Sequence, residues 1–456
     1  MPLASFVQAV WHFGEGPLTP ADRARLLASM NAGRLVILCG AGLSMAPPSS
    51  LPSAWLVAGM CFDEYRVTID PLIEPALRDN LEALAEHFVG LNTLKSVFIE
   101  HLVPWKEFER PPNPGHAAIA DFLITKSVVA GLSSNYDKLI ERCAWDYGAD
   151  FRGALDGDQA TVISHRQAPL LKFHGCSHID RESTVWAPSQ LHDPTISDRI
   201  AKSGIWMAAN LRQKDLLVVG FWSDWDYLNR VLGGAVQGLN PLSVTVIDPS
   251  PSAALQVKAP DLWALANQPQ VTFAHIQESG ADALDELRRA FSEAFARQVL
   301  VAGSAALVAK TGIACDPTWL TVSGLDAEAL YDWRRDAEGV PAGKPALSKS
   351  PQNVDLLGYF HLLLRRAGAV QQPRGYTLAG KSIRVVNGAG FDISTVARRF
   401  IEAPATPTAD VFVAAGSLDL GLPGHLVRPG TAGSVVRPGI GGKWVTMEQA
   451  QVELGV

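Results

Sequence analysis

The chain has 456 residues, of which 47% are hydrophobic and 19% charged, and its formal net charge is −7. This length suits two or three domains with substantial cores, and the composition excludes disordered and fibrous proteins. The acidic balance argues against a protein that wraps nucleic acid, so direct nucleic-acid binding is not expected.

The cysteines are few and scattered, at positions 39, 61, 143, 176 and 315. No pair has the Cys-x-x-Cys spacing, which excludes a zinc ribbon and a thioredoxin-type redox motif, so no metal is expected. An odd number of scattered cysteines indicates reduced thiols. Met1 to Gly16 lacks the basic start of a signal peptide, and no apolar run approaches the ~20 residues of a membrane helix. The sequence therefore predicts a cytoplasmic protein that does not enter a membrane.

Apolar strands alternate with amphipathic helices through the first two-thirds of the chain. A helix is expected to begin at Thr19-Pro20 and to end at Gly33, because threonine caps a helix and proline fits its first turn. The sequence predicts strands at 35–39, 128–130, 170–173, 216–219, 244–247 and 271–276, and further helices at 72–103, 115–123, 138–147 and 281–299. Short, continuously apolar strands between helices are typical of a buried parallel sheet. The expected fold is α/β, a Rossmann-like doubly wound parallel sheet with a helical insertion.

The texture of the sequence changes after about residue 300, where glycine and proline separate shorter elements. We expect a catalytic domain over residues 1–298, a linker with helical and loop segments over 299–352, and an accessory α+β region over 353–456. The accessory region is expected to regulate or assemble, because the candidate site residues all precede residue 300.

A glycine-rich turn, Gly40-Ala41-Gly42-Leu43-Ser44, follows the first predicted strand. Glycines at such a turn allow the backbone to approach a pyrophosphate, although a tight strand-to-loop turn explains them equally well. The full Gly-x-Gly-x-x-Gly pattern is not met, because position 45 is Met. An ordinary hydride-transferring Rossmann enzyme is therefore disfavoured.

Two further polar segments follow strands. Asn135 and Asp137 come after the second strand, and His174-Gly175 comes after the third. Taken singly, the first is a turn with a helix cap and the second is a packed structural histidine. Because ligands bind beyond the carboxyl ends of parallel strands, we expect these segments and the glycine-rich turn to converge on one site.

The ordered set of motifs resembles the sirtuin family over about residues 30–298. It runs Gly40-Ala-Gly-x-Ser44, Asn135-x-Asp137, His174-Gly175 and Gly220-Phe-x-x-Asp224. Pro114-Gly115-His116 is similar to a helix start of that family, although His116 is expected to be structural.

The sequence also departs from the protein-deacetylating sirtuins. The zinc ribbon is missing, Leu51-Pro52-Ser53-Ala54-Trp55 replaces the expected Pro-Asp-Phe-Arg, and the middle motif reads Ser-Asn-Tyr-Asp. These features resemble the zinc-free bacterial sirtuin-like NAD hydrolases of anti-phage defence. That resemblance implies cleavage of NAD to ADP-ribose and nicotinamide, with NAD as the substrate.

The resemblance and the residue types together suggest roles for each candidate. Asn135 would position a ribose hydroxyl or the attacking water, and His174 would accept the proton. Asp137 would hold the nicotinamide amide or only cap its helix. Asp248 would bind the adenosine ribose or only form a turn. The remaining cofactor-binding candidates are Gly40, Ala41, Gly42, Ser44, Gly220 and Ser223.

An unregulated NAD hydrolase would be toxic, so gating by a homo-oligomer, a ligand or a partner such as a HerA-type ATPase is expected. Two alternatives stay open: an NAD-dependent protein deacylase, and a non-catalytic module that binds NAD or ADP-ribose to control assembly. Residues 375–382 match the P-loop pattern Gly-x-x-x-x-Gly-Lys-Ser letter for letter. Because a strand-like run follows rather than a helix, we expect a β-turn there and no ATPase.

Overall fold

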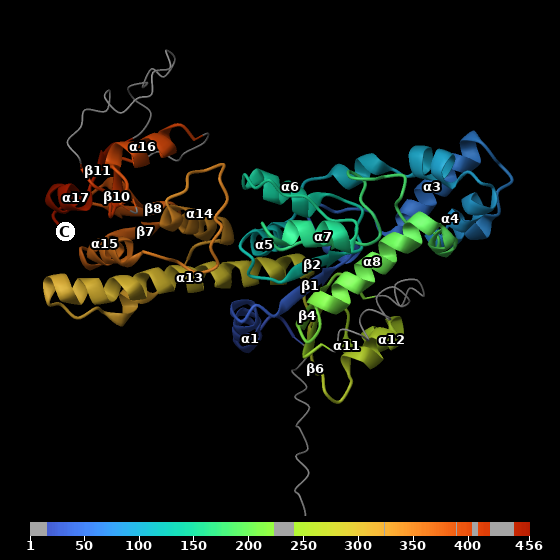
Figure 1. Cartoon of the computed structure of the whole chain (residues 1–456), viewed down its shortest axis with the longest axis horizontal. Helices are drawn as coiled ribbons and strands as arrows, with labels where there is room; N and C mark the ends of the chain where they lie inside the picture. The colour runs from blue at the N-terminus through green and yellow to red at the C-terminus, as the bar shows by residue number, and fades with distance from the viewer. Residues whose placement is uncertain (1–15, 223–240, 323, 389, 404–408, 420–441) are drawn as a thin grey trace, which may run out of the picture. The chain divides into compact units, whose positions relative to one another are not determined.

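The computed structural model describes residues 16–222, 241–322, 324–388, 390–403, 409–419 and 442–456 (Figure 1). The chain divides into two compact units. Unit 1 comprises Met1–Trp145 and Asp150–Leu287, and unit 2 comprises Asp146–Ala149 and Arg288–Val456. Helix α13 (Gly280–Thr311) begins in the first unit and ends in the second.

Unit 1 is built on a six-stranded parallel sheet in the order β3-β2-β1-β4-β5-β6. The strands are β1 (Leu35–Cys39), β2 (Ala130–Ser133), β3 (Leu170–Lys172), β4 (Asp215–Val219), β5 (Ser243–Ile247) and β6 (Thr272–Ile276). The chain order reverses direction between β1 and β4, which defines a doubly wound, Rossmann-like α/β fold and confirms the predicted fold class. The continuously apolar strands are buried along almost their whole length, as a parallel sheet covered on both faces requires.

Helices flank this sheet and connect its strands. They are α1 (Pro20–Asn31), α2 (Ala41–Met45), α5 (Pro114–Ile124), α6 (Leu139–Asp146), α7 (Gly157–Ser164), α8 (Pro194–Asn210), α11 (Ser252–Lys258), α12 (Pro260–Ala266) and the start of α13, with a 3-10 turn, η4 (Pro188–His192). The predicted capping of α1 is confirmed, because the Thr19 side chain accepts a hydrogen bond from the Asp22 amide.

A helical insertion follows α2, and its hydrophobic cluster also includes Trp186 and Ala187 from the segment after β3. It contains α3 (Ala54–Thr68), η1 (Pro75–Leu77), α4 (Leu81–Gly90), the π-helix η2 (Leu94–Leu102) and η3 (Trp105–Glu109). In Figure 1, α3 and α4 lie together at one end of unit 1. The single helix predicted over 72–103 is wrong: Asn80 caps a new helix at Leu81, and Asn92 interrupts the run with a left-handed backbone, φ 56°.

Unit 2 contains a mixed five-stranded sheet in the order β11-β10-β9-β8-β7. Its strands are β7 (Val370–Gln372), β8 (Gly375–Leu378), β9 (Lys381–Asn387), β10 (Val411–Ala415) and β11 (Lys443–Val445). Its remaining helices are η6 (Pro317–Leu320), α14 (Ala327–Glu338), α15 (Asp355–Arg366), α16 (Ile393–Ile401) and α17 (Met447–Leu454). Strands β7 to β9 pair antiparallel and β9 to β11 pair parallel, so this region is α+β.

The segment that matches the P-loop pattern is a β-hairpin. Strands β8 and β9 pair antiparallel with Leu378 opposite Lys381, and Ala379 and Gly380 have φ of 48° and 79°. Two positive φ values at a two-residue turn are the geometry of a tight hairpin connection, which glycine favours. No helix follows the glycines, so the predicted β-turn is confirmed.

We expect Lys381→Ala to change the free energy of unfolding by less than about 0.5 kcal/mol, because surface substitutions have small effects. The Lys381 side chain is 48% exposed, and its Nζ lies 3.7 Å from Oε1 of Glu453. We also expect no nucleotide hydrolysis in either protein. Denaturant titration and a phosphate-release assay check both expectations.

The matched control in the same strand is Arg384→Met. Arg384 is buried and donates two hydrogen bonds to Asp336, at 2.8 and 2.6 Å. Removing one partner of a buried ion pair costs about 3–5 kcal/mol. An ATPase activity that disappears in Lys381→Ala would contradict the hairpin interpretation.

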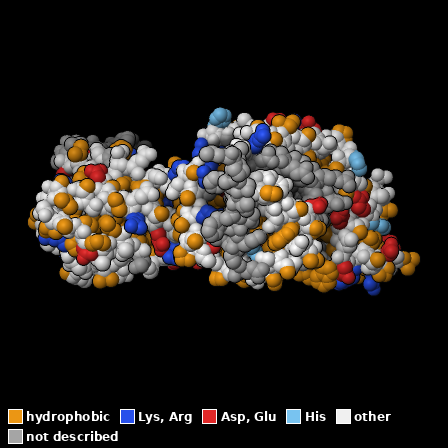
Figure 2. All heavy atoms as spheres, turned by 90° about the horizontal axis from the view of Figure 1, so that it is seen from below, with side chains coloured by type: hydrophobic (Ala, Val, Ile, Leu, Met, Phe, Trp, Pro, Cys, Tyr) orange, Lys and Arg blue, Asp and Glu red, His pale blue; other side chains and the backbone are white. Residues whose placement is uncertain are grey.

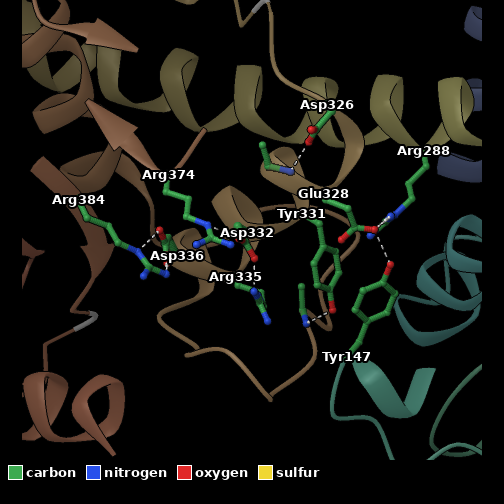
Figure 3. Close-up of polar contacts among 12 residues, drawn as sticks. Tyr147, Arg288, Asp326, Glu328, Tyr331, Asp332, Arg335, Asp336, Arg374 and Arg384 are labelled. Carbon is green, nitrogen blue, oxygen red and sulfur yellow. Dashed lines mark hydrogen bonds and ion pairs between the residues drawn. The ribbon is translucent and has the colours of Figure 1, made fainter. Parts of the chain in front are cut away.

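The short segment Asp146–Ala149 packs within unit 2 (Figure 3). The Tyr147 hydroxyl and the Arg288 guanidinium both donate to Glu328, at 2.9 and 2.5 Å. The Arg288 guanidinium also lies 5.1 and 5.0 Å from the ring centroids of Tyr147 and Tyr331. Cation–π contacts and a charge-assisted hydrogen bond therefore hold this segment in unit 2.

Charged side chains of both signs are interspersed with hydrophobic ones on the face drawn in Figure 2. Within the described ranges, every helix is too short or too polar to cross a lipid bilayer.

Candidate active site

The strands of unit 1 end in register at the edge where ligands bind in such sheets. Cys39 of β1 pairs with Ser133 of β2 and with Val219 of β4. Ser133 pairs in turn with Lys172 of β3, and Val219 pairs with Ile247 of β5. The polar segments predicted from the sequence follow these residues directly, so they begin side by side along one edge of the sheet.

The glycine-rich turn lies against the end of β4. The Gly42 amide donates to the Gly220 carbonyl at 2.9 Å, and the Gly40 amide donates to the Val219 carbonyl at 3.1 Å. A Cβ atom on Gly42 would lie 2.9 Å from the Gly220 Cα, and one on Gly220 would lie 2.2 Å from the Leu43 nitrogen. Gly220 also has a left-handed backbone, φ 59°. The close approach of two main chains therefore requires glycine at both places.

Ser44 is the centre of a buried polar cluster. Its hydroxyl donates to Asp137 Oδ2 at 2.9 Å and accepts a hydrogen bond from Asn135 Nδ2 at 3.1 Å. His116 Nε2 lies 3.0 Å from the same oxygen. All four side chains are buried. The structure thus brings together Ser44, Asn135 and Asp137, which the sequence places about 90 residues apart.

His116 is a member of this cluster, whereas the sequence indicated only a structural residue. The main-chain amide of Asn113 donates a hydrogen bond to His116 Nδ1 at 3.1 Å. The ring hydrogen is therefore on Nε2 and points to the Ser44 hydroxyl. Burial lowers the pKa of His116 to about 4, which keeps the ring neutral. The Pro114-Gly115-His116 motif was the only sequence signal for this residue. It indicates the start of helix α5 but not the contact between His116 and Ser44.

Asn135 has an acceptor that no described residue satisfies. Its amide nitrogen donates to the Gly40 carbonyl at 3.2 Å as well as to Ser44. Its Oδ1 is buried and makes no hydrogen bond to any described part of the chain. An unsatisfied buried acceptor costs about 1–3 kcal/mol, so its presence suggests a ligand atom that donates to it.

Asp137 has two contacts that correspond to the two interpretations of its motif. Oδ1 accepts the Leu139 amide at 3.1 Å and so holds the start of α6, while Oδ2 accepts the Ser44 hydroxyl. The Asp137 carbonyl accepts a hydrogen bond from the Lys172 ammonium, which also donates to Glu141 at 3.1 Å. Burial acts to lower the pKa of Lys172, but Glu141 and its other acidic neighbours raise it above its ordinary value.

His174 lies two residues beyond β3 and packs against the loop that carries Asn135 and Asp137. Its ring stacks with Tyr136, with centroids 6.2 Å apart and planes 25° apart. Burial lowers its pKa to about 3, and the positive charge of Arg199 acts in the same direction. The ring is therefore neutral at physiological pH and can accept a hydrogen bond.

Two other predicted site residues that the structure describes, Asp248 and Ala41, make no hydrogen bond to the Ser44 side chain. Asp248 follows β5, and its Oδ1 accepts the Ser250 amide at 2.8 Å, while its Oδ2 lies 3.8 Å from Lys258. The contact with Ser250 forms a turn, which was one of the two interpretations of this residue, and the contact with Lys258 is an ion pair. Ser223 and Asp224 lie outside the described residues. Ala41, the first residue of α2, is exposed.

The described residues contain no group of three or more His, Cys, Asp or Glu side chains that could hold a metal ion. All five cysteines are free thiols, and burial raises the pKa of Cys39 to about 12.

A family described as "SIR2-like domain" matches residues 130–264. Among solved structures, the chain is similar to a Sir2 homologue in complex with NAD, with 15% identity, 61% of this chain and 96% of that chain covered, and a TM-score of 0.37. It is also similar to a Sir2 homologue variant in complex with ADP-ribose, with 16% identity, coverage of 58% and 95%, and a TM-score of 0.33. The sequence matches none of the curated proteins with which it was compared.

Proposed function

We propose that this chain is an NAD glycohydrolase, which cleaves the nicotinamide–ribose bond of NAD to give ADP-ribose and nicotinamide. The observation that carries the proposal is the buried, unsatisfied Oδ1 of Asn135 in a cluster with Ser44 and Asp137. It supports a donor such as a ribose hydroxyl or a water molecule at that atom. The match of residues 130–264 to the SIR2-like domain is consistent with this chemistry.

Asn135 and Asp137 have definite tasks under this proposal. Loss of nicotinamide generates positive charge on the ribose, as in other glycosidic cleavages. Asn135 Oδ1 accepts a hydrogen bond from the hydroxyl or water that it orients, while its amide nitrogen stays fixed by Gly40 and Ser44. The Asp137 carboxylate stabilises developing positive charge or holds the nicotinamide amide.

His174 is proposed to act on the attacking water. A ring with a pKa of about 3 is a weak base, so it accepts a hydrogen bond before the bond breaks and does not remove a proton early. Water becomes far more acidic as it adds to a positively charged ribose carbon. A late proton transfer to a neutral, buried imidazole fits that sequence of events.

The glycine-rich turn is proposed as the cradle for the pyrophosphate. Ala41 and Gly42 are exposed, Gly40 is buried beside them against Phe221, and Gly220 approaches the turn from the end of β4. Ser223 and Asp248 are proposed to bind the rest of NAD, with Asp248 at the adenosine ribose.

We also propose that the activity is regulated by the second unit, by a homo-oligomer or by a HerA-type ATPase partner. The proposed biological role is anti-phage defence in the cytoplasm. Both proposals rest on the resemblance of the motif set and on the expectation that free NAD hydrolysis must be gated. A phage-infection assay of cells that carry this gene, with and without a co-expressed HerA-type ATPase, would test the defence role.

We expect the purified protein, alone or with its activating partner, to consume NAD without any acylated peptide. We expect His174→Ala to lower kcat by about 10²–10⁴-fold, because it removes the proton acceptor. Release of nicotinamide, followed by chromatography, measures both. The control is His101→Ala, which changes an exposed histidine of the helical insertion and should leave turnover unchanged.

Circular dichroism establishes that each variant is folded. Nicotinamide release that depends strictly on an acyl-lysine peptide would favour a deacylase instead. A folded His174→Ala protein with the wild-type rate would remove His174 from the mechanism, and tight NAD binding with no turnover would favour the assembly module.

A further inference from the structure

A second candidate ligand site lies in unit 1, in a cavity of about 190 Å³ between the helical insertion and the segment after His174. One wall is the 3-10 helix η3, which contributes Trp105 and Phe108. The other is formed by Ser177 and Arg181. None of these residues belongs to the cluster around Ser44.

The Arg181 guanidinium is the notable group in this cavity. It lies over the Trp105 ring, with its central carbon 4.9 Å from the ring centroid. No acidic side chain in the described part of the chain forms an ion pair with it. Arginine is the side chain best suited to bind a phosphate through several donors, and stacking on an aromatic ring fixes its plane. The Arg181 guanidinium, stacked on the Trp105 ring, therefore presents an uncompensated positive charge to the cavity.

The other polar side chains of the lining favour an anion as well. Lys138 adds a second positive charge, Ser177 adds a hydroxyl, and His178 adds a ring that can donate. Glu109 is the single acidic residue of the lining, and its carboxylate lies 3.6 Å from Lys138. With one carboxylate against one guanidinium and one ammonium, the lining has a net positive charge.

We propose that this cavity binds the phosphate group of a small ligand. A volume of 190 Å³ is below the ~300–1,000 Å³ typical of sites for drug-sized molecules, so the cavity holds a phosphate and little more. The ligand is free phosphate, or the phosphate end of a phosphomonoester whose remaining part stays outside. The inference is independent of NAD cleavage, because none of the lining residues has a role in the proposed reaction.

The cavity adjoins the loop of the candidate active site through the main chain. The Ser177 amide donates to the Tyr136 carbonyl at 2.9 Å, and Lys138 follows Asp137 directly. A bound phosphate would therefore lie next to the residues that flank Asn135, which gives such a ligand a place from which to regulate the loop.

Isothermal titration calorimetry of the full chain with inorganic phosphate and with ribose 5-phosphate tests the proposal. We expect the wild type to bind one equivalent, and Arg181→Gln to weaken binding by about tenfold or more, because a charged hydrogen-bond donor is lost. The comparison of the two probes identifies the source: stronger binding of ribose 5-phosphate indicates a phosphomonoester, and equal binding indicates free phosphate.

A second variant acts in the opposite direction. Glu109 has a side chain that is 62% exposed, so Glu109→Gln should fold normally and should tighten phosphate binding several-fold by removing a repulsive charge. Arg66→Gln is the matched control for Arg181→Gln, because it removes the same positive charge at an exposed arginine outside the cavity. No binding by the wild type at 10-millimolar phosphate, or equal weakening in Arg181→Gln and Arg66→Gln, would overturn the proposal.

Discussion

Replacing Asn135 with alanine is expected to lower kcat for NAD cleavage by about 10²–10⁴-fold. The substitution removes the buried Oδ1 acceptor and the two hydrogen bonds that fix the amide to Gly40 and Ser44. Positioning effects of this kind are large, because a shift of about 1 Å at the reacting atoms can cost about 100-fold. Steady-state NAD turnover at saturating substrate measures the effect.

Two variants make the result specific. Asn135→Asp keeps the size and an acceptor but places an oxygen against the Gly40 carbonyl, so it should also lose activity. Asn387→Ala is the matched control, because Asn387 is another buried asparagine whose amide donates to a main-chain carbonyl, that of Ala337 at 2.9 Å. It should lower stability without a comparable loss of kcat. An Asn135→Ala enzyme that is folded and retains more than a tenth of the wild-type rate would contradict the proposed role.

Unit 1 is expected to lose stability steeply as the pH falls below about 6.5. His116 and His174 are buried, and burial lowers their pKa values to about 4 and about 3. In the unfolded chain both rings take up protons near pH 6.5, whereas in the folded protein they stay neutral. The unfolded state therefore binds more protons, so each histidine reduces the free energy of unfolding by about 1.4 kcal/mol per pH unit. Together they give a slope of about 3 kcal/mol per pH unit between pH 6 and pH 5.

Urea unfolding at intervals between pH 7.5 and pH 5, with a probe in unit 1, measures this slope. His116→Gln should reduce it by about half. The control variant is His101→Gln, which changes an exposed histidine of the same unit. His361 in unit 2 is buried and has a pKa of about 3 for the same reason, so that unit should respond in the same direction. A stability that does not change between pH 7 and pH 5 would mean that these rings are protonated or exposed in the folded protein.

The sheet and the positions of the site segments could be predicted because their signals are local. A buried parallel strand such as Leu35–Cys39 is a short, continuously apolar run whatever its partners are. The run after Gly380 is strand-like and carries no helical pattern, so the hairpin could be distinguished from a P-loop. The residues after each strand then had to lie at one edge of the sheet, which located Ser44, Asn135 and Asp137.

The rest depends on contacts between distant segments. The break in the predicted helix over 72–103 is caused by single residues such as Asn92, while the apolar spacing on either side still suggests one helix. His116 could be recognised as part of a helix start, but its contact with Ser44, 72 residues away, leaves no local pattern. The packing of Tyr147 with Arg288 and Glu328 is likewise a meeting of three separate segments.

The buried ion pair at the end of β3 determines the electrostatic character of the candidate site. The Lys172 ammonium and the Glu141 carboxylate lie 3.1 Å apart and cancel, and both buried histidines are neutral at physiological pH. The Asp137 carboxylate is then the one uncompensated charge among these groups. In a dry environment such a charge attracts cations far more strongly than it would in water. Under the proposed function, the candidate active site would select the oxidised dinucleotide, whose nicotinamide ring is cationic, over the reduced form, whose ring is neutral.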